Sequence, residues 1–213
     1  MASAIIHIAI AKELENKLQI RNKREYYLGA IAPDISKQVG SSREDSHFLK
    51  NTKDEIPNIK LFTQKYPSFI FNEFDLGYYI HLYTDKLWIE DFLSNIKEGE
   101  FIRLLDGTTI KSKPNELRNL IYSDYTNLNE TIIDEYNLDL SLFYEEFEVP
   151  KTKIKEIPIE KLDILINKMG ILIENSKETK PYTFDIYTIK AFIEDATKKI
   201  GDKIDTYKNQ LLI

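Results

Sequence analysis

The sequence predicts an all-α fold, and three observations support this class. Only 7 Gly and 7 Pro interrupt the 213 residues, so long stretches can remain helical. Apolar residues recur at intervals of three and four, which is the spacing of one face of a helix. Hydrophobic residues form 42% of the chain, enough to build a sizeable core. We expect a single multi-helix domain over residues 1–213.

Composition excludes several classes of function. The net charge of −6 and the pI of about 5.3 provide no overall basic field, so extended binding to nucleic acid is not expected. The chain has no cysteine, which removes disulfides and thiolate metal sites. No apolar run approaches the ~18 residues that span a bilayer, and the start does not resemble a secretory signal. We expect a soluble cytoplasmic protein, and the sequence carries no signal of its oligomeric state.

The first helix is expected from Ser3 to Gln19, because serine is a favoured N-cap. Its apolar face includes His7, whose side chain should therefore point into the core. A second helix over residues 25–32 should end at Pro33, since a proline disfavours helical geometry in the residue before it.

The next two segments carry the other histidines. Residues 41–60 predict a loop with short helical turns, in which His47 points inward. A long helix from about 67 to 95 follows. It carries His81 and Asp85, which lie four residues apart and so project from the same face.

The second half of the chain is predicted to be helical apart from one turn. The Asp-Gly pair in FIRLLDGTTIKS indicates a small β-hairpin over residues 101–111. A helix opened by Pro114 should follow. The last segment, residues 159–211, is expected to form a helical pair, 159–176 and 185–211, that packs on the rest.

All three histidines occur in the first 85 residues, each among apolar neighbours, and two aspartates share these surroundings. The five residues are His7, Asp34, His47, His81 and Asp85. Burying a carboxylate without a partner is very unfavourable, so these aspartates need cations or hydrogen-bond donors. A divalent metal would satisfy all five side chains, and a mixed His/Asp set fits zinc, iron, manganese or nickel better than calcium.

Each of these residues also has an ordinary interpretation. His7 could be a hydrogen-bonded core residue, and His47 could be exposed in a charged loop. Asp34 could cap the next turn, and Asp85 could pair with a cation such as Lys86. One shared site explains the five residues more simply than five separate accidents.

In the order His7, LGAIAPDI, SHF and GYYIHLYTDKLW, these motifs resemble the zinc-dependent phospholipase C family, which is related to the S1/P1-type nucleases. The resemblance covers residues 3–92. It implies an all-α fold that hydrolyses phosphoester bonds at a cluster of metal ions. It also implies that four residues form one metal site: Asp34, His47, His81 and Asp85. Asp85 would bridge to a second ion that also binds His7.

The chain departs from the family pattern because no histidine follows Asp85. One or two ions, most simply zinc, are therefore expected in place of a full three-ion cluster. Asp91 and Asp124 are candidates for a missing ligand, although the ordinary interpretation of both is solvated surface.

The function implied is that of a metal-dependent phosphoesterase, phospholipase C-like, acting on a small phosphoester or a lipid headgroup. Asp34 is the candidate catalytic proton acceptor. The candidate substrate-binding residues are Lys37, Arg43, Lys50, Trp88 and Asp124, and the ordinary interpretation of the cations is surface charge. The sequence contains no glycine-rich phosphate loop and no serine nucleophile motif, so the chemistry would depend on the ions.

Two alternatives remain. An HD-type phosphohydrolase is also helical and binds metal through His and Asp, but it requires an adjacent His-Asp pair, which this sequence lacks. A non-catalytic helical protein with a structural metal is the other. A catalytic site keeps an open coordination position facing a cleft, whereas a structural site is closed by protein ligands.

Overall fold

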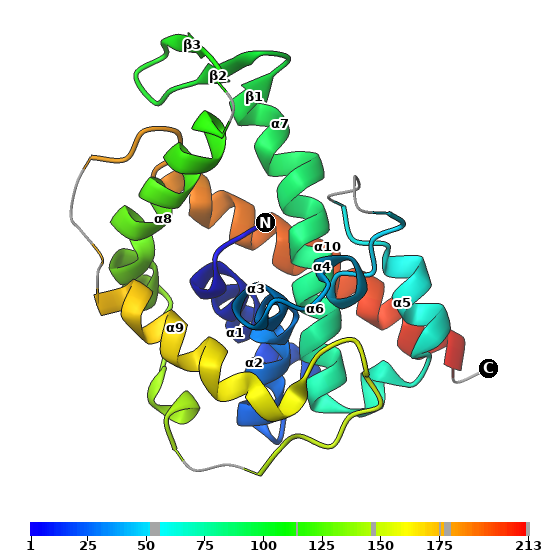
Figure 1. The fold of residues 1–213 in the computed structure, drawn as a ribbon. Helices are drawn as coiled ribbons and strands as arrows, with labels where there is room; N and C mark the ends of the chain where they lie inside the picture. The colour runs from blue at the N-terminus through cyan, green and yellow to red at the C-terminus, as the bar shows by residue number, and fades with distance from the viewer. Residues whose placement is uncertain (52–55, 114, 146–147, 175, 177–179, 212–213) are drawn as a thin grey trace.

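A computed structural model of the chain confirms the all-α class with a small sheet (Figure 1). It describes residues 1–51, 56–113, 115–145, 148–174, 176 and 180–211. The α-helices are α1 (Ala4–Leu18), α2 (Lys23–Ile31), α3 (Ser36–Val39), α4 (Arg43–Ser46), α5 (Ile59–Lys65), α6 (Glu73–Leu87), α7 (Leu93–Ile96), α8 (Glu116–Glu135), α9 (Leu162–Glu174) and α10 (Ile186–Leu211). Short helical turns are η1 (Ala32–Ile35), η2 (Phe69–Phe71), η3 (Trp88–Phe92), η4 (Ser141–Phe143) and η5 (Ile159–Lys161). The strands are β1 (Lys97–Glu98), β2 (Phe101–Arg103) and β3 (Thr109–Lys111).

The N-terminal helices α1 and α2 lie at the centre of the view in Figure 1, and α6, α8, α9 and α10 surround them. Both helices predicted for the C-terminal segment are present. They do not pack mainly on each other, because α10 packs against α1 and α6 while α9 packs against α8 and η1. Residues 175 and 177–179 of the predicted segment lie outside those described.

Helix α1 begins as the sequence predicts. The hydroxyl of Ser3 accepts a hydrogen bond from the backbone N–H of Ile6, 3.3 Å away, and this satisfies a free donor of the first turn. The predicted inward face is buried, and His7 is fully buried with it. Gln19 ends the helix in the left-handed region, with φ of +58°.

Helices α2 and α6 cross at very close range, and two glycines make this possible. A Cβ atom on Gly77 of α6 would lie 2.1 Å from the carbonyl oxygen of Tyr26 in α2. A Cβ on Gly29 of α2 would lie 2.0 Å from the carbonyl oxygen of Phe74. Only the absence of a side chain on both helices permits this approach. The crossing brings the backbone of α2 beside the face of α6 that carries His81.

Helices α6 and α7 are joined by η3, so the chain stays helical from residue 73 to 96. In η3 the backbone N–H of Leu93 donates to the carbonyl of Trp88, five residues back, which is a π-helical turn. The prediction placed the start of this helix near residue 67. That start was wrong, because the Asn72 side chain accepts from the N–H of Asp75 and caps α6 there.

The small sheet confirms the predicted hairpin and adds one strand. Strands β2 and β3 pair antiparallel, with Ile102 opposite Ile110, and Gly107 adopts φ of +84° in the predicted turn. Strand β1 pairs antiparallel with β2 through a tight turn in which Gly99 adopts φ of +57°. Glycine reaches such positive φ values without steric cost. The sheet lies at one end of the molecule (Figure 1).

Among the described residues, no helix is both long enough and apolar enough to cross a membrane.

Candidate metal centre

The fold brings all five predicted ligand residues together. The residues are His7 from α1, Asp34 from η1, His47 directly after α4, and His81 and Asp85 from α6. Two overlapping groups have ligand atoms within 4.8 Å of one another: His7, His81 and Asp85 in one, and Asp34, His47 and His81 in the other. Either group could hold a metal ion. The histidines and Asp85 are fully buried, so His47 is not the exposed loop residue that its ordinary interpretation allowed.

Asp85 lies at the centre of the cluster and faces two ways. Its Oδ1 atom lies 3.3 Å from His7 Nε2. Its Oδ2 atom lies 3.6 Å from both His47 Nε2 and His81 Nε2. The backbone N–H of Ala2 donates to Oδ1 at 2.9 Å, and this hydrogen bond helps to fix the carboxylate. Each oxygen of Asp85 therefore faces a different set of ring nitrogens.

The arrangement of the ligand atoms suits metal coordination better than hydrogen bonding between the side chains. The Nε2 atoms of His7, His47 and His81 and the Oδ2 atom of Asp85 are buried and have no hydrogen-bond partner among the described residues. Buried polar atoms without partners are rare in folded proteins because each costs free energy. Unpartnered atoms gathered in two neighbouring groups could be satisfied by a cation, and nitrogen and oxygen donors of this kind suit zinc and similar transition metals.

His81 is oriented by the close helix crossing. Its Nδ1 atom lies 2.8 Å from the carbonyl oxygen of Ala30 in α2. A carbonyl only accepts, so Nδ1 carries the proton and donates. This leaves the lone pair of Nε2 directed into the cluster, which is the tautomer that a metal ligand needs. His81 also stacks on His7, with ring centroids 3.8 Å apart.

His47 is oriented by a chain of hydroxyls. Its Nδ1 atom lies 2.9 Å from Ser46 Oγ. The Ser46 hydroxyl can donate to Ser36 Oγ at 3.0 Å, and Ser36 in turn donates to the carbonyl of Pro33 at 3.3 Å. Because each hydroxyl donates its proton toward the carbonyl of Pro33, Ser46 Oγ is left to accept a hydrogen bond from His47 Nδ1–H. The Nε2 lone pair of His47 is again left for the cluster.

Charge also suits a divalent ion. Burial alone would raise the pKa of Asp34, but the ammonium of Lys37, 2.8 Å away, holds this pKa well below its usual range. Burial is likewise outweighed at Asp85, whose pKa is lowered by His7 and His81. Burial lowers the pKa of His81 to about 3. Burial lowers the pKa of His47 as well, so at neutral pH the cluster offers two carboxylates and the neutral imidazoles of His47 and His81, the forms that bind a metal.

Asp34 is the one ligand residue that reaches the surface. Its side chain is 14% exposed, whereas the other four are fully buried. Its Oδ1 atom lies 2.8 Å from Lys37 Nζ and 3.5 Å from His47 Nε2. Lys37 also lines a cavity of about 800 Å³. The cavity therefore lies next to the cluster on the side of Asp34, with Lys37 between them.

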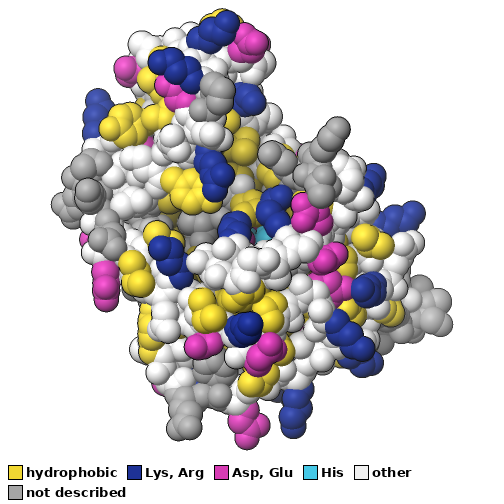
Figure 2. All heavy atoms as spheres, viewed as in Figure 1, with side chains coloured by type: hydrophobic (Ala, Val, Ile, Leu, Met, Phe, Trp, Pro, Cys, Tyr) yellow, Lys and Arg dark blue, Asp and Glu magenta, His cyan; other side chains and the backbone are white. Residues whose placement is uncertain are grey.

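The cavity collects three of the five predicted substrate-binding residues, Lys37, Arg43 and Trp88. Figure 2 shows Lys and Arg side chains gathered around a hollow on this face, with apolar side chains on its floor and a histidine just visible between two basic groups. Lys50 is exposed and does not line the cavity.

Asp124 is neither a surface residue nor near the cluster's ligand atoms. It is fully buried, and its carboxylate accepts from the backbone N–H groups of Tyr182 and Thr183, both at 2.7 Å. Its role is to attach the segment before α10 to α8. The other reserve ligand, Asp91, pairs with Lys199 on the surface at 2.9 Å. Neither joins the groups of possible metal ligands found among the described residues.

Sequence reasoning missed the groups that orient the histidines. Ser46 was visible as the neighbour of His47, and Ser36 lies two residues after Asp34. A small hydroxyl next to a ligand is a weak signal, but it could have identified them. The carbonyl of Ala30 could not be identified, because every residue has a carbonyl. Gly77 lies four residues before His81 in the sequence, but its contact with the backbone of α2 could not be identified from that spacing.

No family model matches the chain, and no match was found among curated proteins or solved structures.

Proposed function

We propose that this protein is a metal-dependent phosphoester hydrolase that holds one or two divalent ions, most simply zinc. The observation that carries the proposal is the separation of the ligand atoms. The four contacts of Asp34 and Asp85 with ring nitrogens measure 3.3, 3.5, 3.6 and 3.6 Å. These are longer than the 2.7–3.2 Å of ordinary N–H···O hydrogen bonds.

The same separations agree with tetrahedral coordination. Two ligands of a tetrahedral ion with bonds of about 2.1 Å lie about 3.4 Å apart. Octahedral coordination at the same bond length would bring them to about 3.0 Å. This favours zinc over magnesium. The two faces of Asp85 support a second ion next to His7.

When bound, a divalent ion supplies the Lewis acidity and the acidified water on which phosphoester hydrolysis depends. The chain's own groups perform the other tasks. Asp34, at the open side of the cluster, accepts the proton of the attacking water. Lys37 and Arg43 line the adjacent cavity and bind the phosphate oxygens. The hydrogen bonds from His47 and His81 keep the ligands in position, so little reorganisation is needed when substrate binds.

The resemblance of the same motifs to the zinc-dependent phospholipase C family supports this reaction class, and a small phosphoester or a lipid headgroup is the corresponding substrate. A structural metal is the competing proposal. The partial exposure of Asp34 and the adjacent cavity lined by its partner Lys37 favour catalysis, since a structural site is closed on all sides by protein ligands.

The test measures metal content and hydrolysis of bis(p-nitrophenyl) phosphate by the zinc-loaded protein. We expect Asp34→Asn to lower kcat/KM about a hundredfold or more, since it removes the proton acceptor. Asp85→Asn should lose more metal than His7→Ala, because Asp85 faces both ion positions. Asp91→Asn is the matched control, a surface aspartate whose replacement should leave metal content and activity unchanged.

Three results would contradict the proposal in different ways. Absence of stoichiometric metal in the wild-type protein would remove its premise. Retention of metal and activity by the Asp85 variant would place the site elsewhere. Stoichiometric metal without hydrolysis of any phosphoester would indicate a structural site.

A further inference from the structure

We infer that the cavity beside the metal centre contains a second anion-binding subsite at its far end, formed by Lys97, Lys111, Lys113 and Arg118. The substrate would then be a phosphoester that carries a second anionic group, separated from the first by an apolar or ring-bearing part. The inference rests on the proposed function for the identity of the first group.

The charge of the cavity lining contrasts with that of the whole chain. The protein has a net charge of −6, yet the cavity lining includes six cations and a single carboxylate, Glu100. The cations are Lys37, Arg43, Lys97, Lys111, Lys113 and Arg118. Cations gathered in a concave site focus a positive potential there, and this concentrates anionic ligands. An acidic chain that keeps this large cavity basic has the charge distribution of an anion receptor.

The cations at the far end are weakly engaged by the protein itself. Among the described residues, neither Lys97 nor Lys113 forms an ion pair. Lys111 pairs with Glu100 at 3.2 Å, but both side chains are more than 70% exposed, and such pairs contribute little. Arg118 lies over the ring of Tyr122, 5.5 Å from its centroid, which leaves its guanidinium edge free for hydrogen bonds.

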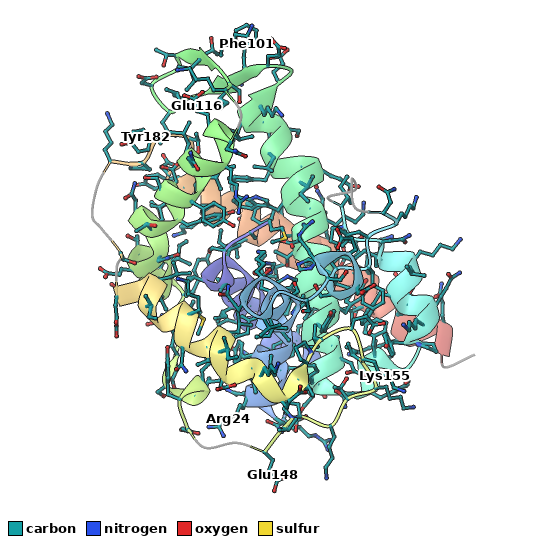
Figure 3. All side chains as sticks on the ribbon, in the orientation of Figure 1. Arg24, Phe101, Glu116, Glu148, Lys155 and Tyr182 are labelled. Atoms are coloured by element: carbon teal, nitrogen blue, oxygen red, sulfur yellow. The ribbon has the colours of Figure 1, made fainter. Side chains whose placement is uncertain are left out.

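The two groups of cations are too far apart to bind one phosphate. Lys37 contacts Asp34 at the metal centre. Lys97 lies twelve residues after Asp85, directly after the helical segment that ends at Ile96, and this corresponds to roughly 18 Å along the axis. Lys111 and Lys113 lie at and beyond the end of β3, next to the start of α8. Figure 3 shows Glu116, the first residue of α8, just below the sheet that carries Phe101.

Between the two ends the cavity is apolar. This part of the lining consists of Trp88, Ile89, Leu93, Leu117, Ile121 and Tyr122. Trp88 is fully buried, and its indole N–H has no acceptor among the described residues. An apolar wall with a few polar groups is typical of sites for small molecules. The arrangement is complementary to a molecule with an anion at each end and a chain or ring between them.

This complementarity predicts which substrates the cavity selects and which it rejects. A substrate whose leaving group carries a cation, such as a choline or ethanolamine ester, would place that cation among the basic residues at the far end and be rejected. A substrate with a phosphate or carboxylate in that position would be selected. The second anion could come from a soluble metabolite or from an anionic lipid headgroup, and the chemistry recognised is the same.

The experiment measures binding by titration calorimetry of the purified zinc-loaded protein. The probes are alkanediol bisphosphates of increasing spacer length, each compared with the alkyl monophosphate of the same length. We expect the bisphosphate to bind about tenfold more tightly than its monophosphate once the spacer reaches both ends. Shorter spacers should show no such preference. The preference should decrease at high salt.

The variant Lys97→Gln/Lys113→Gln should reduce the preference for the bisphosphate to near one. The variant Lys97→Arg/Lys113→Arg should retain it, because the charges remain. A matched control, Lys60→Gln/Lys168→Gln, removes two exposed lysines that lie outside the cavity lining and should also retain it. Quenching of the single tryptophan, Trp88, provides an independent readout of binding in the cavity.

Two arms distinguish the sources of the anion. One uses soluble bisphosphates, and the other uses phosphatidylcholine vesicles with and without a minority of phosphatidic acid. Binding that depends on Lys97 and Lys113 in either arm supports the subsite. Wild-type protein that binds bisphosphate no more tightly than monophosphate, or a preference that survives Lys97→Gln/Lys113→Gln, overturns it. Lysine-dependent binding by a protein without hydrolytic activity would leave the subsite standing while the proposed function fails.

Discussion

Replacing Gly77 by alanine should damage both stability and metal binding, although it adds only one methyl group to a helix. The new Cβ would lie 2.1 Å from the carbonyl oxygen of Tyr26, and ordinary contact begins at 3.4 Å. The helices must therefore separate locally by about 1.3 Å, the difference between these distances. If the shift acts along the 2.8 Å hydrogen bond from His81 to Ala30, that bond is lost.

The magnitude follows from two costs. Overpacking at a rigid backbone contact costs about 1–3 kcal/mol, and an unsatisfied buried hydrogen-bonding group costs about 1–3 kcal/mol more. Alanine returns about 1 kcal/mol through its higher helix propensity. We expect Gly77→Ala to lower the free energy of unfolding by about 1–5 kcal/mol. Loss of the hydrogen bond that orients His81 should weaken zinc binding by about 10–100-fold.

The assay is urea unfolding of the metal-free protein, followed by a competition titration for zinc. The control is Gly201→Ala in α10, where the new Cβ meets the mobile end of Lys17 at 2.8 Å. Lys17 is 45% exposed and can move away at little cost, so this variant should keep its zinc affinity and be no less stable than the wild type. Equal stability and equal zinc affinity in the two variants would refute the role assigned to the crossing.

Three further outcomes are expected. Ser46→Ala should weaken zinc binding about tenfold or more in a competition titration, because it removes the acceptor for His47 Nδ1–H. Unchanged affinity would show that the chain of hydroxyls does not contribute to zinc binding. Glu15→Gln should lower the free energy of unfolding by about 1–2 kcal/mol at neutral pH, measured by urea unfolding. Although burial raises the pKa of Glu15, an ion pair and a hydrogen bond from Tyr27 hold this pKa below its usual value. Since the pKa is depressed in the folded state, this contribution is present above the ordinary value of about 4.3 and is lost as the pH falls below it, so a penalty that persists in acid would contradict the assignment. Asp124→Ala should cost about 3 kcal/mol by leaving a buried and a partly buried N–H group without an acceptor, while metal content stays unchanged; loss of metal would make Asp124 a ligand after all.

The helices and the ligand residues could be predicted because both depend on local patterns. An apolar face with a period of 3.6 residues places His7 inside the core before any tertiary contact is known. Four-residue spacing places His81 and Asp85 on one face for the same reason. That these faces meet was inferred from the difficulty of burying carboxylates, and the resemblance provided the order of the motifs.

The remaining features depend on contacts between distant residues. Asp124 has the sequence context of a surface residue, and its partners Tyr182 and Thr183 are 58 and 59 positions away. The start of α6 was misplaced because apolar residues before Asn72 continue the helical pattern, whereas the capping side chain ends it. Strand β1 has two residues and shows no pattern of its own. The basic residues that line the cavity come from segments far apart in the sequence, so no local pattern indicates that they meet.

The π-helical turn at Trp88–Phe92 changes the direction in which side chains project from the helical segment before and after it. One extra residue in a turn advances everything after it by about 100° around the axis. The phase of that turn thus decides which way Lys97 faces relative to Asp85, and the number of residues between them decides how far apart they are. The length of this helical segment therefore sets the distance between the two ends of the cavity. Substrates of a different length would require an insertion or deletion in this segment and could not be reached by exchanging side chains alone.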